Sequence, residues 1–319
     1  GPTKNKMPIN TVFFGTPSFV IPVLTALINA GEFKVSGIIT GKGPMNLIGV
    51  DYGIKVFQPE TLRQSSGQAD ESFLNLFKSL RPDLCVVAAY GKIIPKEYLD
   101  VPKYGFLNIH PSLLPKYRGP SPCQYAILNG DNETGVTIMK VDEEMDHGDI
   151  VANLKLKTGL PGQGNLKLNS RELCEKLFQM GAELLIKTIP DYIDGKIKLI
   201  PQDHSQATYT KKLTFQEGKI DWSEPAEKII NKIRAFNPEP GAWTQLPNGK
   251  ILKIYEVEMS AQETSNKQPS EIIIKEKNIY VTSKDFLIEI KTLQPEGGKL
   301  QTAQEFINGH KKLRGQKIP

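Results

Sequence analysis

Cysteine is scarce in this sequence, and its distribution excludes two kinds of scaffold. The 319 residues include three cysteines, Cys85, Cys123 and Cys174. They are odd in number, far apart and without a CxxC spacing or nearby histidines, so neither a disulfide framework nor a zinc site is predicted. Cys85 lies in the apolar run 84–89, which favours a reduced core thiol over a catalytic nucleophile.

Long hydrophobic runs are also missing. No apolar stretch approaches the roughly 20 residues that cross a membrane as a helix, so no membrane association is expected. The start, Gly1-Pro2-Thr3, resembles what a protease leaves after removing a tag, and Met7 is the expected native start. Because no signal peptide or Arg-rich transit segment follows, we expect a cytoplasmic, bacterial protein, with a trimmed organellar protein as the alternative.

The excess of positive charge is small. The chain carries 40 basic and 35 acidic residues, a net charge of +5, and residues 201–319 carry 18 against 15. This balance permits binding to nucleic acid without requiring it. A hydrophobic content of 39% and a mean hydropathy of −0.31 are typical of a globular protein, and the length is sufficient for two domains.

Strands and helices alternate through the first two thirds of the chain. Helices are predicted at residues 19–30, 71–80 and 171–189, and short apolar strands at 11–14, 34–40, 84–90 and 106–110. This alternation predicts an α/β fold with a doubly wound, Rossmann-like parallel sheet over residues 8–199. The first turn, Gly15-Thr16-Pro17, has one glycine instead of the GxGxxG pattern, which disfavours a nucleotide-binding oxidoreductase.

The composition changes after residue 199. Residues 200–212 are polar and are predicted to form a linker, whereas residues 213–319 contain mainly short strands separated by turns with Gly or Asn. This pattern predicts a smaller OB-like β-barrel or another compact β-domain. Lysines cluster here at 211–212, 250–253 and 311–317, either as a solubilising surface or as a contact surface for nucleic acid.

Residues 106–122 contain the most informative motif of the chain. Asn108 and His110 are two positions apart in a predicted strand, so both side chains project from the same face. Four prolines follow, at positions 111, 115, 120 and 122, and they restrict the loop to few conformations. The motif favours a small-molecule site, with a hydrogen-bonded structural pair or a Pro-rich partner motif as alternatives.

A second motif is the acidic loop at residues 141–149, which has five carboxylates in eight residues. It is either a solvated turn or a functional loop. The spacing does not match an EF-hand, because Gly148 is misplaced for one. A carboxylate from this loop placed near His110 would instead hold the orientation of the imidazole and favour its protonated form.

Taken together, the motifs resemble the folate-dependent formyltransferases. The resemblance rests on Asn108-Ile109-His110 with residues 112–115, on residues 135–138 and on 145–149. Further matches at residues 14–17, 87–91, 220–222 and 234–238 extend it from about residue 11 to about residue 310. The matches after residue 200 separate this chain from the glycinamide ribonucleotide formyltransferases, which resemble only its first domain.

The resemblance implies that 10-formyltetrahydrofolate donates a formyl group to the α-amine of methionyl initiator tRNA, for translation initiation. It implies that Asn108, His110 and Asp146 are catalytic, that no metal takes part, and that the second domain positions the tRNA. A monomer is expected. The folate contacts implied by the resemblance are Tyr90, Gly91, Ser112, Leu113, Leu114, Pro115, Val141 and Asp142.

These residue types suit acyl transfer to an amine. Asn108 and protonated His110 would donate hydrogen bonds to the oxyanion that forms, a stabilisation worth about 3–4 kcal/mol per donor. Asp146 would pair with His110 and help to move the ammonium proton. The segments 40–57 and 158–170 look short for the family, which leaves the grip on the acceptor stem open.

Three other functions are considered. The same catalytic residues would serve a formyltetrahydrofolate hydrolase or a sugar-amine N-formyltransferase. A non-catalytic RNA-binding module would bind RNA without turnover.

Overall fold

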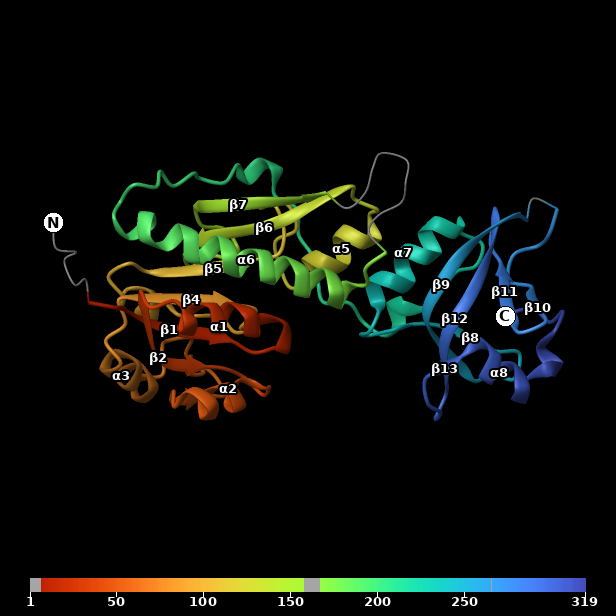
Figure 1. Cartoon of the computed structure of the whole chain (residues 1–319), viewed down its shortest axis with the longest axis horizontal. Helices are drawn as coiled ribbons and strands as arrows, with labels where there is room; N and C mark the ends of the chain where they lie inside the picture. Colours follow the sequence, from red (N-terminus) through yellow and green to blue (C-terminus); the bar gives the residue numbers. More distant parts are fainter. Residues whose placement is uncertain (1–6, 158–166, 265) are drawn as a thin grey trace. The chain divides into compact units, whose positions relative to one another are not determined.

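The computed structural model of the chain describes residues 7–157, 167–264 and 266–319 (Figure 1). It divides into two compact units. The first comprises the described parts of Gly1–Pro122, Glu133–Lys157 and Cys174–Thr210, and the second those of Cys123–Asn132, Thr158–Leu173 and Lys211–Pro319. The predicted domain limits at 199 and 212 stay predictions, and the expectations for residues 1–3 and for most of 158–170 lie outside the described residues.

A seven-stranded sheet forms the centre of the first unit, in the order β3-β2-β1-β4-β5-β6-β7. Its strands are β1 (Ile9–Gly15), β2 (Phe33–Ile39), β3 (Val56–Phe57), β4 (Leu84–Ala88), β5 (Phe106–His110), β6 (Glu133–Lys140) and β7 (Ile150–Lys157). The first five strands pair in parallel, and β6 and β7 pair antiparallel beside β5. The predicted α/β fold is confirmed, and the sheet is mixed.

Helices accompany this sheet. They are η1 (Ser18–Val20), α1 (Ile21–Asn29), α2 (Met45–Tyr52), α3 (Glu71–Ser79), α4 (Lys96–Leu99), α6 (Ser170–Ile193) and η2 (His204–Gln206). Helix α6 approaches β5 closely, because Gly181 has no side chain: a Cβ there would lie 2.7 Å from Cγ2 of Ile109. The close approach fixes the strand that carries the candidate site.

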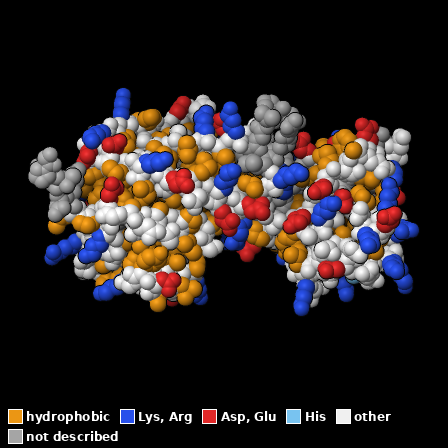
Figure 2. Space-filling view, viewed as in Figure 1, with side chains coloured by type: hydrophobic (Ala, Val, Ile, Leu, Met, Phe, Trp, Pro, Cys, Tyr) orange, Lys and Arg blue, Asp and Glu red, His pale blue; other side chains and the backbone are white. Residues whose placement is uncertain are grey.

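The second unit is built on a smaller, antiparallel sheet. Its strands are β8 (Ala242–Gln245), β9 (Ile251–Glu263), β10 (Ile272–Lys275), β11 (Asn278–Thr282), β12 (Phe286–Pro295) and β13 (Gln301–Thr302). The helices are α5 (Pro122–Leu128), η3 (Gln216–Gly218), α7 (Ala226–Phe236), α8 (Ala303–Gly309) and η4 (Lys311–Leu313). Lys and Arg side chains lie among Asp and Glu side chains on its visible face (Figure 2).

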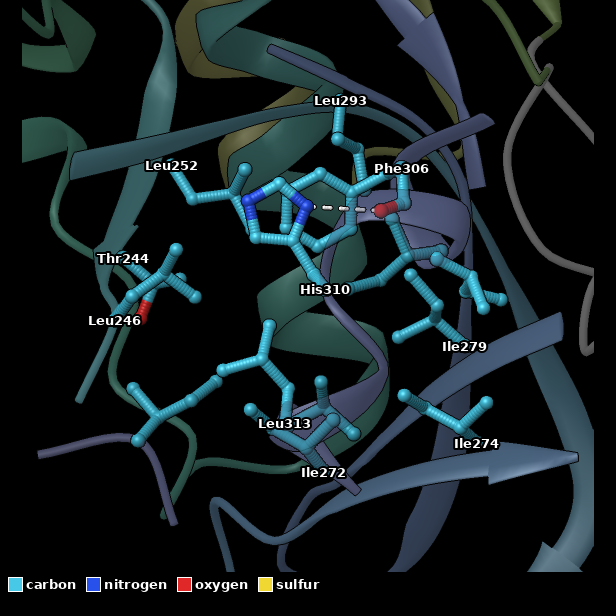
Figure 3. Close-up of a pocket in the computed structure, with 14 residues that line it drawn as sticks. Thr244, Leu246, Leu252, Ile272, Ile274, Ile279, Leu293, Phe306, His310 and Leu313 are labelled. Atoms are coloured by element: carbon cyan, nitrogen blue, oxygen red, sulfur yellow. Dashed lines mark hydrogen bonds between the residues drawn. The ribbon is translucent and has the colours of Figure 1, made fainter. Parts of the chain in front are cut away.

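A small cavity lies in the core of the second unit (Figure 3). It is lined by aliphatic side chains such as Leu252, Ile272 and Leu293, together with Phe306 and His310. The His310 ring stacks on Phe306 with centroids 4.0 Å apart, and its Nδ1 donates to the Phe306 carbonyl over 2.9 Å. The cavity therefore belongs to the apolar core of this unit.

None of the helices in the described part of the chain combines the length and the apolar character needed to cross a membrane. In the same residues, no three His, Cys, Asp or Glu side chains are grouped as metal ligands.

Candidate active site

The carboxyl ends of β1, β4 and β5 meet at one edge of the parallel part of the sheet, where α/β proteins bind ligands. Residues at the ends of β1 and β4 touch there: the Thr16 hydroxyl donates to the Tyr90 carbonyl over 3.4 Å, and the ring of Phe14, near the end of β1, lies 5.4 Å from the Tyr90 ring. Asn108 and His110 are the neighbouring polar residues on β5. The structure thus brings the predicted rim residues together.

His110 is buried, with a hydrogen bond at one ring nitrogen and a carboxylate facing the other. Its Nε2 lies 2.8 Å from the Tyr117 carbonyl oxygen, which can only accept, so Nε2 carries a hydrogen. Its Nδ1 faces Asp146, with 3.6 Å between Nδ1 and Oδ1. A carboxylate of the acidic loop therefore lies near this imidazole, and its catalytic role stays a prediction.

Asp146 reaches His110 from a constrained backbone. Its φ is 53°, in the left-handed region that costs a non-glycine residue on the order of 1 kcal/mol. Its other carboxylate oxygen, Oδ2, accepts a hydrogen bond from the Gly119 amide over 2.7 Å. The loop around residue 119 therefore fixes which oxygen of Asp146 faces the imidazole.

Asn108 differs from its neighbours on β5 in being only half-buried. Ile109 is buried and packs on the opposite face of the sheet, against Gly181 of α6, as the alternation of the strand predicts. Among the described residues the Asn108 carboxamide has no hydrogen-bond partner. Its NH2 group is thus open to a ligand at the rim.

The loop at residues 112–115 is rigid, because its polar groups are already engaged. The Ser112 hydroxyl donates to the Lys116 carbonyl over 2.6 Å. Thr137 of β6 bridges the loop: its hydroxyl donates to the Ser112 carbonyl over 2.7 Å and accepts from the Leu114 amide over 3.1 Å. Leu113 packs against Gly135, and the Leu114-Pro115 bond is cis. Their contact with folate stays a prediction.

Tyr90 and Val141, two other predicted folate contacts, belong to one aromatic cluster that includes Phe14 and Phe106. The Tyr90 hydroxyl is buried and has no hydrogen-bond partner among the described residues, and burial raises the pKa of this phenol to about 12. Gly91 has a φ of 77°, which turns the chain away from β4. These residues lie beside the same rim.

Asp142 is engaged within its own loop rather than directed at His110. Its carboxylate lies 2.6 Å from Nδ1 of His147 and accepts from the Glu144 amide over 2.9 Å. The His147 ring in turn stacks on His204, with centroids 4.0 Å apart and planes inclined by 3°. Asp142 and Asp146 therefore have different surroundings within one acidic loop.

Sequence reasoning missed Arg118 and Gln202, which lie next to this pair. Arg118 is 2% exposed and Gln202 5% exposed, and the Arg118 guanidinium donates to the Gln202 side-chain oxygen over 2.8 Å. The sequence signal for Arg118 was its position within a proline-rich loop. Its partner could not be inferred, because 84 residues separate the two.

Two family models match this chain. A family model described as formyl transferase matches residues 9–171, and one described as formyl transferase, C-terminal domain, matches residues 212–311. With an α/β domain, a polar rim on β5 and a second β-domain, the chain belongs to the formyl transferase family, a family of one-carbon transferases.

Full-length relatives carry one particular name. A methionyl-tRNA formyltransferase from Roseiflexus sp. (strain RS-1) is 38% identical, over 98% of this chain and 96% of the relative. The methionyl-tRNA formyltransferase from Bacillus licheniformis is 38% identical, over 96% and 97%. Both relatives therefore match the whole two-domain chain.

Solved structures share the fold at low sequence identity. HypX from Aquifex aeolicus in complex with tetrahydrofolic acid has a TM-score of 0.69 at 16% identity, over 98% of this chain and 49% of that chain. An N-formyltransferase from Helicobacter canadensis, in complex with folinic acid and dTDP-3-aminofucose, has a TM-score of 0.63 at 20% identity, over 91% and 100%.

Proposed function

We propose that the protein transfers the formyl group of 10-formyltetrahydrofolate to the α-amine of methionyl initiator tRNA, the step that prepares this tRNA for translation initiation. The observation that carries the proposal is the buried His110–Asp146 pair beside the open Asn108 carboxamide. The 38% identity to methionyl-tRNA formyltransferases over nearly the whole chain supports the choice of acceptor.

The chemistry needs an oxyanion donor and a proton acceptor. The amine nitrogen forms a bond to the formyl carbon, and the carbonyl electrons move to the oxygen. Asn108 donates to this oxyanion, as does the protonated Nδ1 of His110, because Nε2 is bonded to Tyr117. Collapse restores the carbonyl and breaks the bond between the formyl carbon and N10 of the folate.

Protons must move in the same sequence. The attacking amine becomes an ammonium and loses a proton, and the folate nitrogen gains one. Asp146, which faces His110 across 3.6 Å, accepts the ammonium proton directly or through water. General acid–base help of this kind contributes about 10²–10⁴-fold in rate.

The folate would lie along the rim. Tyr90, Gly91 and Val141 would border the pterin, and Ser112, Leu113, Leu114 and Pro115 would form a rigid wall beside it. Asp142 would contact the pterin through its backbone, because its carboxylate is engaged with His147. No metal is part of this proposal.

Two rival acceptors are less well supported. A formyltetrahydrofolate hydrolase would use water, and a sugar-amine N-formyltransferase would use an amino sugar. The Helicobacter canadensis structure was solved with such a sugar nucleotide, but its 20% identity to this chain supports a shared fold only. The full-length relatives at 38% identity point to the tRNA acceptor.

The test is transfer of radiolabelled formyl from 10-formyltetrahydrofolate to one acceptor at a time. The acceptors are methionyl-tRNA, uncharged tRNA, glycinamide ribonucleotide, a dTDP-amino sugar and none. Formyl-methionyl-tRNA formed only with the charged tRNA is the expected result. Loss of the donor without an acceptor would identify a hydrolase, and transfer to the amino sugar alone would refute the tRNA proposal.

We also propose that the enzyme acts as a cytoplasmic monomer, since translation initiation takes place there and a single chain carries both domains. In the proposal, residues 8–199 form the catalytic domain, 200–212 the linker and 213–319 the tRNA-binding domain. Sedimentation velocity should give a species of about the 35.5 kDa chain mass.

A further inference from the structure

We propose that Arg118 and Gln202 are positioning residues for Asp146. Neither belongs to the proposed catalytic residues, and both lie in the first unit. The inference rests on the proposed function, because it concerns the carboxylate that the formyl transfer uses. A series of hydrogen bonds runs from Arg118 through Gln202 to the loop of Asp146, and the chemical groups involved determine which atom donates and which accepts in each.

The first step is at Asp146 itself, whose left-handed φ of 53° needs outside support. Gln202 supplies it. The Gln202 side-chain NH2 donates to the Asp146 carbonyl over 2.9 Å and to the Gly148 carbonyl over 2.7 Å. One buried carboxamide therefore holds two backbone carbonyls of the loop that carries the carboxylate.

The second step is at the other end of the Gln202 carboxamide. Its Oε1 accepts from Arg118 NH2 over 2.8 Å and from Arg118 Nε over 3.3 Å. A guanidinium only donates and a carbonyl only accepts, so the amide has one permitted orientation. Arg118 thereby directs both Gln202 donors towards the loop.

The third step concerns the residues on either side of Arg118. The Tyr117 carbonyl accepts from His110 Nε2, and the Gly119 amide donates to Asp146 Oδ2. The tripeptide 117–119 thus holds both members of the catalytic pair through its backbone. A shift of Arg118 would move both contacts together.

Arg118 is in turn anchored by a segment far along the chain. Its backbone NH donates to the Thr208 carbonyl over 2.8 Å, and its carbonyl accepts from the Thr210 amide over 2.7 Å. Its NH2 group also donates to His204 Nδ1 over 2.8 Å. Among the described residues none of its contacts is a carboxylate, so side-chain and backbone hydrogen bonds rather than an ion pair hold this buried cation.

Gln202→Glu separates positioning from folding. The new carboxylate still accepts from Arg118, and the added ion pair maintains the local packing. It has no hydrogen to donate, and it faces the Asp146 and Gly148 carbonyls as a third acceptor. The loop loses its support while the Arg118 anchor is kept. Gln179→Glu is the control, since it makes the same chemical change at an exposed position of α6.

We measure kcat and KM for methionyl-tRNA formylation, and the urea midpoint of unfolding. We expect Gln202→Glu to lower kcat about 10–100-fold, the loss that a misplacement near 1 Å produces. KM for both substrates should stay within about threefold and the midpoint close to that of the parent, as for Gln179→Glu. A kcat within twofold of the parent overturns the proposal, as does a loss that only follows a fall in the midpoint.

Arg118→Lys is the second variant, because it keeps the charge but removes the fork that holds Gln202 and His204 together. We expect it to lower kcat in the same way as Gln202→Glu. The double variant should be no slower than the slower single variant, because both act on one carboxylate. If the fold losses in kcat of the two single variants multiply in the double variant, Arg118 and Gln202 do not act through the same carboxylate.

A readout without turnover keeps this inference separate from the proposed function. The chain has four histidines, so selective isotope labelling gives a simple imidazole NMR spectrum, in which His110→Gln assigns the His110 signals. We expect these signals to move in Gln202→Glu and Arg118→Lys, and not in Gln179→Glu. Unmoved signals overturn the inference. If the parent enzyme is inactive with every acceptor, the proposed function is refuted. The His110 signals then still test whether Arg118 and Gln202 position Asp146.

Discussion

Single backbone groups control the candidate catalytic pair. The Tyr117 carbonyl holds one nitrogen of His110, and the Gly119 amide holds one oxygen of Asp146. The facing atoms, Nδ1 and Oδ1, are therefore the ones left for chemistry. A substitution that keeps the shape of the Asp146 side chain can therefore remove its charge and still keep the hydrogen bond from the Gly119 amide.

Asp146→Asn should lower kcat by about 10²–10⁴-fold with little change in KM. The amide oxygen still accepts from Gly119, so the backbone contact is kept while the negative charge opposite His110 is lost. Single-turnover formyl transfer with methionyl-tRNA measures the effect. Asp51→Asn, an exposed position of α2, is the control. A loss of less than tenfold for Asp146→Asn would exclude the assigned role.

The sequence predicted some of these side chains and not others, for a physical reason. Asn108 and His110 share a face because strands have a period of two, a rule that needs no tertiary structure. Asp146 was named as the partner of His110 only through the family resemblance, because spacing along the chain does not single it out from the other carboxylates of the acidic loop. Arg118 and Gln202 meet across 84 residues, and local periodicity carries no information about such a contact.

Strands and helices also differ in how well the sequence predicts them. Strand β4 is buried at every position, and its continuous apolar run predicted it directly. Helix α2 falls within residues 40–57, for which the sequence predicts no helix. Its apolar residues do not mark a buried face, since Leu47 and Val50 are exposed. The antiparallel pairing of β6 and β7 also had no local sequence signal, since pairing direction is a tertiary property.

Gly181→Ala should destabilise the first unit and slow the enzyme. The added Cβ would lie 2.7 Å from Ile109 Cγ2 and 3.0 Å from Val136 Cγ2, and such overpacking costs about 1–3 kcal/mol. The gain in helix propensity, about 1 kcal/mol at most, offsets only part of this. Because Ile109 lies between Asn108 and His110, kcat should fall as well.

Urea unfolding and steady-state kinetics measure the two effects of Gly181→Ala. Gly309→Ala is the matched control, because no atom lies within 4 Å of the Cβ built at that position of α8. We expect the control to leave kcat and stability nearly unchanged. An unchanged urea midpoint for Gly181→Ala would show that α6 can move away from β5 without cost.

In the proposed function, the two units of the chain act on two very different substrates. The donor is a small folate, for which the first unit offers a rim of buried and rigid groups. The acceptor is a polyanion much larger than the site. The second part of the chain, residues 201–319, carries 18 basic and 15 acidic residues, a modest excess. On the visible face of the second unit the basic and acidic side chains are interspersed (Figure 2). Its contribution to tRNA binding should therefore come from local clusters rather than from net charge.

The cluster Lys311, Lys312 and Arg314 is the clearest case, since all three side chains are exposed. If these residues contact phosphates, KM for methionyl-tRNA should rise steeply with salt, because each contact releases counterions. KM for the folate donor should change little over the same range. Replacing all three by Gln should reduce the slope of log KM against log salt by up to about one unit per lost contact.

The control changes the same number of charges elsewhere. Lys34, Lys55 and Lys78 are exposed in the first unit, and their replacement by Gln should leave the salt slope for tRNA near that of the parent. Equal slopes for the two triple variants would mean that net charge alone draws the tRNA to the enzyme. A smaller slope only in the Lys311, Lys312 and Arg314 variant would assign phosphate contacts to the end of the second domain, because the two variants lose the same number of positive charges and differ in where they lose them.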